Sequence, residues 1–151
     1  MTKAPEDAQL DALLDHALAR KAHYPTFLLV QRAGAALSPA GKELLTALEE
    51  FLITSVESDR WPGTQLSGEK ARVMFFHLER GAVNQLKHVG KLAAFVGPQM
   101  PEDLCILAAD KTPWLASAAR DGRFLLHLTD DERKAAQKAL PWLQLEDDHQ
   151  T

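Results

Sequence analysis

Two histidines, His77 and His127, lie in apolar stretches that predict β-strands, and their side chains suit metal binding or proton transfer. Two imidazoles with a carboxylate from a loop would bind zinc or iron, and one imidazole with a carboxylate would suit a small hydrolase. The chain has no HExxH, HxH or HxxxH pattern, and it has one cysteine. We therefore predict no catalytic residue, no metal site and no cofactor. A small hydrolase-like or metal-dependent enzyme using His77 or His127 is the alternative.

The single cysteine, Cys105, lies within the apolar stretch LCILAA. A nucleophilic cysteine needs an electropositive, partly exposed setting, so this context predicts a buried and unreactive thiol. No serine lies in a GxSxG frame. The acidic pair in PED, at 101–103, precedes a predicted strand, and we expect it to serve the turn there.

A basic stripe is predicted on the helix expected over residues 79–96. Its members follow one another at helical spacing: Arg80, Asn84, Lys87, His88 and Lys91. Residues 61–100 carry five basic and two acidic side chains in a chain of net charge −4. The stripe predicts docking of an acidic protein surface or an anion, although a solvated helix face is the simpler interpretation. Nucleic-acid binding through this helix is a weaker alternative, because such proteins usually carry a basic excess.

The stretch ESDRWPGTQL, residues 57–66, places Trp61 in a polar segment. Residues 55–70 show no periodicity, which predicts a long loop, and loops of this length are often functional. The Pro62-Gly63 pair fits the centre of a type II turn. We expect Trp61 to be largely buried with its indole N–H paired. The alternative is an exposed Trp61 that anchors a partner protein.

Apolar periodicity and turn residues predict the elements that must position these side chains. Helices are expected over 5–21, 39–54, 79–96 and 130–140, and strands over 27–31, 71–78, 104–110, 114–120 and 124–129. Ser38-Pro39 and Thr129 with Glu132 are helix-start signals, and Asp121-Gly122 is a hairpin signal. The order predicts an α+β fold: a mixed five-stranded sheet with a C-terminal antiparallel meander, packed by three to four helices.

The bulk composition limits the class of protein. With 151 residues, 46% hydrophobic and 25% charged, the chain suits a single globular domain over 1–151 rather than a disordered segment. One cysteine allows no internal disulfide, and no leader or membrane-length apolar run is visible. We therefore expect a cytoplasmic protein with no membrane association.

Three short blocks resemble a group of small uncharacterised bacterial proteins: WPGT at 61–64, PEDLC at 101–105 and PWL at 113–115. The resemblance covers roughly the C-terminal two-thirds of the chain. It implies a bacterial origin and a shared fold, with no established activity. In that group we associate a His-Glu pair with the stretch after PWL, whereas this chain has Arg120 and Asp121 there, which weakens a catalytic role.

The functional hypothesis is a non-enzymatic cytoplasmic binding or regulatory protein of immunity type. It would bind its partner through the 55–70 loop and the helix at 79–96. The expected partner-binding residues are Trp61, Arg80, Lys87, His88 and Lys91.

Overall fold

The computed structural model describes residues 7–32, 34, 36–62, 64–90, 94–97, 99–119 and 123–140. Its elements in chain order are α1 (Asp7–Ala19), β1 (Thr26–Arg32), α2 (Pro39–Leu48), the 3₁₀ turn η1 (Glu49–Phe51), β2 (Leu52–Ser58), β3 (Arg60–Trp61), β4 (Thr64–Gln65), β5 (Ala71–His77), α3 (Arg80–Lys87), β6 (Glu102–Leu107), β7 (Pro113–Ala118), β8 (Arg123–Leu126) and α4 (Asp130–Ala139).

Six strands form the main sheet in the order β2-β5-β1-β6-β7-β8, and β3 pairs with β4 in a small ribbon. Every pairing in both sheets is antiparallel. The predicted α+β class, with a helix-packed sheet, is confirmed. The sheet differs in detail from the expected mixed, five-stranded one, because it gains a strand and contains no parallel pair.

The additional strand is β2, which lies in the segment predicted to end a helix and begin a loop. The helix expected to reach Thr54 stops at Leu48, and η1 then turns the chain into β2. Residues 53–57 of this edge strand are all exposed. A strand that buries neither face shows no alternation of apolar and polar residues, so its pattern resembles that of a loop.

The C-terminal meander is confirmed, since β6 pairs with β7 and β7 pairs with β8. The first connection is a tight turn, closed by a hydrogen bond from the Ala108 N–H to the Thr112 carbonyl at 2.8 Å. The predicted Asp121-Gly122 turn lies outside the described residues.

Local start signals act as predicted on two helices. The Ser38 hydroxyl accepts a hydrogen bond from the Gly41 N–H at the start of α2, and Thr129 with Glu132 forms a capping box on α4. The helix predicted over 79–96 is shorter than expected, because α3 ends at Lys87. Gly90 follows with φ of 94°, a left-handed conformation that commonly ends helices.

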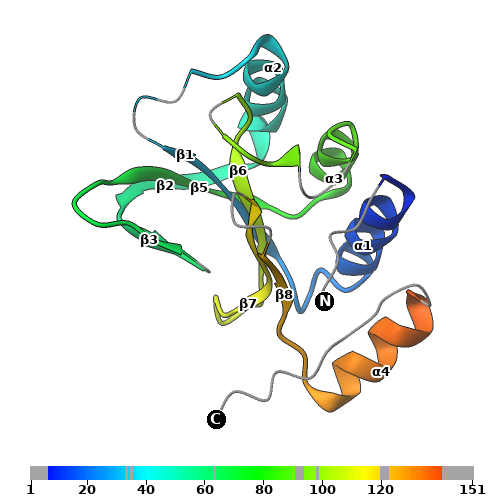
Figure 1. Ribbon diagram of the computed structural model, residues 1–151. Helices are drawn as coiled ribbons and strands as arrows, with labels where there is room; N and C mark the ends of the chain where they lie inside the picture. Colours follow the sequence, from blue (N-terminus) through cyan, green and yellow to red (C-terminus); the bar gives the residue numbers. More distant parts are fainter. Residues whose placement is uncertain are drawn as a thin grey trace.

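The two faces of the sheet are covered differently (Figure 1). One face packs against apolar side chains from all four helices, and this larger core includes Phe27, Phe76 and Trp114. The other face carries a smaller core around Leu28, Val73 and Cys105, which Trp61 covers from the β3–β4 ribbon. The ribbon side is therefore the side on which part of the sheet is left accessible.

Candidate functional site

The β3–β4 ribbon brings Trp61 onto the second face of the sheet. Arg60 pairs with Gln65 and Trp61 with Thr64, so part of the segment predicted as a loop is a short hairpin. Trp61 is 6% exposed and packs with Leu28 and Val73. Its predicted burial is confirmed. Because the ring is buried, Trp61 cannot itself be the exposed anchor of the alternative interpretation.

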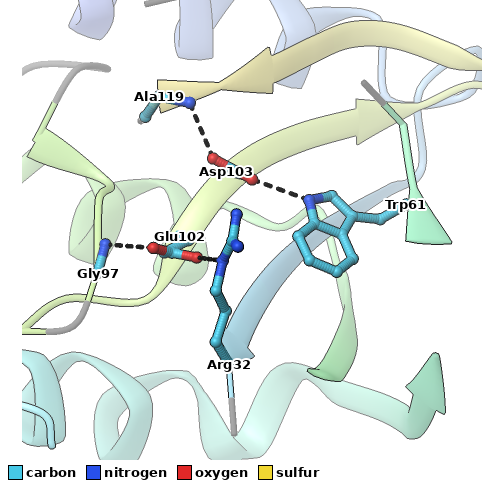
Figure 2. Close-up of polar contacts among 6 residues, drawn as sticks. All are labelled: Arg32, Trp61, Gly97, Glu102, Asp103 and Ala119. Atoms are coloured by element: carbon cyan, nitrogen blue, oxygen red, sulfur yellow. Dashed lines mark hydrogen bonds and ion pairs between the residues drawn. The ribbon is translucent and has the colours of Figure 1, made fainter. Parts of the chain in front are cut away.

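A buried polar network holds the indole in place (Figure 2). The Trp61 Nε1–H donates to Asp103 Oδ2 at 2.8 Å, which confirms that the indole is paired. The Ala119 N–H donates to the other oxygen, Asp103 Oδ1, at 2.8 Å. Asp103 therefore joins the ribbon to the end of β7. Burial, the largest influence, raises the pKa of Asp103, while its two hydrogen bonds act in the opposite direction.

Asp103 reaches both partners because it lies in a β-bulge. Leu28 pairs with Cys105 but Val30 pairs with Glu102, so β6 has an extra residue at this point. Asp103 takes φ of 58°, a left-handed conformation that aspartate tolerates better than most residues. The bulge turns two successive carboxylates into the protein, where Glu102 is 2% and Asp103 1% exposed.

Glu102 is paired through both oxygens. Arg32 Nε lies 2.5 Å from Glu102 Oε2, and the Gly97 N–H donates to Glu102 Oε1 at 2.8 Å (Figure 2). The guanidinium carbon of Arg32 lies 5.4 Å from the centre of the Trp61 ring, so Arg32 also makes a cation–π contact. The expectation that the PED acids serve only a turn is wrong. The sequence does carry one signal for the burial of these carboxylates, which is the position of two acids directly before a fully apolar run.

Beside this ribbon lies a recess of about 260 Å³. Its apolar lining comes from Leu28, Val56, Trp61, Pro62, Val73, Phe75 and Leu107. Ser58, Arg60 and Lys111 supply its polar groups, and no described acidic side chain lines it. Val56 is 45% exposed. The recess therefore offers apolar contact with positive charge at its border.

Of the two cations that line the recess, Arg60 and Lys111, Lys111 is the more available for pairing with an acidic group. Arg60 Nε lies 3.2 Å from Asp59 Oδ1, whereas Lys111 makes no ion pair with any described residue. Lys111 takes φ of 70° in the β6–β7 turn, where glycine or asparagine would be less strained. Lys111 therefore strains the backbone of this turn, and glycine would relieve that strain.

The basic stripe on α3 is less available than the sequence indicated. Lys87 Nζ lies 2.7 Å from Asp15 Oδ1 on α1, and Arg80 Nη1 lies 3.8 Å from the same oxygen. The acid that pairs with the stripe comes from a different helix, α1. His88 caps the end of α3 and is exposed, and Lys91 lies outside the described residues.

The histidines do not form a site together. His77 ends β5 and His127 follows β8, with β1, β6 and β7 between them, so the strands are roughly 20 Å apart. Both side chains are exposed. His16 is half-buried, and its ring centroid lies 6.0 Å from that of Trp114. Burial, assisted by the charge of Arg20, lowers the pKa of His16.

Cys105 is fully buried beneath the ribbon, as predicted, with its Sγ 3.9 Å from the Pro62 carbonyl oxygen. Burial raises the pKa of its thiol to about 12. Its location makes it a structural residue of the second core.

Comparison with protein-family models, curated proteins and solved structures finds no match to this chain. The described residues contain no group of three or more His, Cys, Asp or Glu side chains arranged to hold a metal ion. In the same part of the chain, no helix is long and apolar enough to cross a membrane. Arg120 and Asp121 lie outside the described residues.

Proposed function

We propose that this is a non-enzymatic cytoplasmic binding protein that takes an acidic segment of a partner protein into the recess beside Trp61. An apolar side chain of that segment would fill the recess, and a neighbouring carboxylate would pair with Lys111. The observation that carries the proposal is an accessible apolar recess bordered by an unpaired lysine, with no acid in its described lining.

The size of the recess favours a partner protein over a small molecule. Its volume of about 260 Å³ is below the roughly 300–1,000 Å³ of typical small-molecule sites. Protein interfaces commonly place one apolar anchor in a pocket with charged groups at the border. The lysine then contributes orientation and charge selection more than raw affinity.

Rigidity of the site supports the same function. Trp61 forms one wall, and its ring is held by packing, by the hydrogen bond to Asp103 and by Arg32. A wall that is ordered before binding lowers the entropic cost of association. Arg80 and Lys87 are left out of the proposed surface because Asp15 already neutralises them in part.

The test is an amide-resolved NMR titration with a capped peptide of two leucines flanked by glutamates. We expect shift changes at the Val56, Phe75 and Lys111 amides and at the Trp61 indole. The matched control peptide carries lysines in place of the glutamates, and it should leave these resonances nearly unchanged. Equal shifts with both peptides, or shifts confined to other surfaces, would contradict the proposal.

A further inference from the structure

One edge of the main sheet is unusually accessible. β2 is an edge strand of seven residues that pairs only with β5 within the sheet. Of the three large hydrophobic side chains that are exposed in the described chain, two lie on β2: Ile53 at 46% and Val56 at 45%. The opposite edge strand, β8, has four residues. The two edges therefore differ in the length of backbone that they offer for pairing.

β2 also lacks the usual protection of an edge. Natural edge strands commonly carry lysine or proline, or are very short, because a free edge invites another strand. Leu52–Ser58 contains neither residue type, and its one charged side chain is Glu57. The bulge between Leu52 and Thr54 disturbs only one end of the strand.

We propose that a second copy of this chain pairs antiparallel with β2, about a two-fold axis at Ser55. This register uses the whole strand, because Ser55 is its middle residue and Leu52 then lies opposite Ser58. A symmetric antiparallel pair requires one residue to lie opposite itself, and the uncharged Ser55 meets that requirement. An axis at Glu57 would instead place two carboxylates opposite each other, which is unfavourable.

The charges near β2 fit the same register. Glu57 of each copy lies opposite Ile53 of the other, so the strand's carboxylates do not face each other. The register therefore brings no pair of like charges on β2 into direct opposition.

Such a dimer would extend the sheet to twelve strands and bring the two recesses close to a common axis, since Val56 and Ser58 border each recess. A partner with two acidic segments would then bind both copies. The pairing itself does not depend on the recess, so either proposal can fail without the other.

The test is the mass of the protein in solution, measured by sedimentation equilibrium over a wide concentration range. We expect the mass to rise toward twice 16.7 kDa with concentration. Ser55→Lys and Ser55→Glu should each remain at the mass of one chain, because they place like charges opposite each other at the axis. An equal mixture of the two variants should regain the doubled mass, because the charges at the axis are then opposite.

Ser67→Lys is the matched control, since Ser67 is exposed and lies outside every strand, and it should associate as the unmodified protein does. Recovery in the mixture also shows that both variants are folded. A single-chain mass at every concentration would overturn the proposal. A dimer unaffected by Ser55→Lys, or a mixture that does not recover, would also overturn it.

Discussion

The two faces of the sheet are held by different forces. The helix side is a conventional apolar core, in which Phe27 and Phe76 stack with ring centroids 5.0 Å apart. The ribbon side has a small apolar core that depends on one tryptophan and two buried carboxylates. Four helices exclude water from the first face, while a two-stranded ribbon covers only part of the second. The larger apolar core thus lies on one face, and part of the other face is left accessible.

The two tryptophans in the described part of the chain, Trp61 and Trp114, are both buried and show the same contrast. Trp114, on the helix side, stacks on Tyr24 with ring centroids 4.7 Å apart, and its indole N–H has no acceptor among the described residues. Trp61 has an acceptor in Asp103. Tyr24 in turn donates to Glu132 on α4, and burial raises the pKa of Tyr24 to about 12. Packing therefore dominates at Trp114, while packing and directional bonding act together at Trp61.

The largest effect is expected from removing the ring that covers the second face. Trp61→Ala should lower the free energy of unfolding by about 3–5 kcal/mol, because it exposes the small core and leaves Asp103 Oδ2 without its donor. Denaturant unfolding measures this change. Unchanged stability would mean that the ribbon contributes nothing to the fold. It would contradict the claim that the second face depends on Trp61.

A comparison of two conservative variants sharpens the contrast. Trp61→Phe keeps most of the ring but removes the donor to Asp103, which should cost about 1–3 kcal/mol. Trp114→Phe removes a donor that has no described acceptor, so its cost should come from lost packing alone and should be smaller than that of Trp61→Phe. The free energies of unfolding of the two variants, measured under the same conditions, show which tryptophan contributes a hydrogen bond to stability. A larger loss at Trp114 would show that its indole N–H is satisfied.

A smaller effect of opposite sign is expected at Lys111. Lys111→Gly should raise the free energy of unfolding by about 0.5–1 kcal/mol, because glycine takes φ of 70° without strain. The same variant should weaken binding of the acidic peptide. Lys134→Gly is the control in the interior of α4, where it should instead cost about 1 kcal/mol. Destabilisation by Lys111→Gly would show that the turn is not strained at this position.

The smallest effect is expected when a thiol reagent is added to the folded protein, where its target would be Cys105. With a thiol pKa of about 12 and a buried side chain, it should not react with a thiol reagent at neutral pH. Labelling should become measurable in Trp61→Phe, since the ribbon over Cys105 is then held less firmly. Rapid labelling of the unmodified protein would indicate that the ribbon opens readily.

The helix-covered face could be predicted well from the sequence, because its central strands are short apolar runs and its helices carry local start signals. The strand at 26–32 and the Thr129–Glu132 capping box are examples. β2 could not be predicted, because both its faces are exposed and its pairing depends on β5. The buried carboxylates also depend on tertiary contacts: Glu102 is paired with Arg32, seventy positions away along the chain. Local patterns do not report such distant partners.

The most direct test of the binding account measures the affinity of the leucine peptide flanked by glutamates for three proteins. Lys111→Glu should weaken binding by about tenfold or more, equivalent to losing one charge-assisted pair, and should create a preference for the lysine-flanked peptide. Lys134→Glu carries the same charge change on α4, away from the recess, and should bind as the unmodified protein does. Undiminished affinity of Lys111→Glu for the acidic peptide would contradict the account.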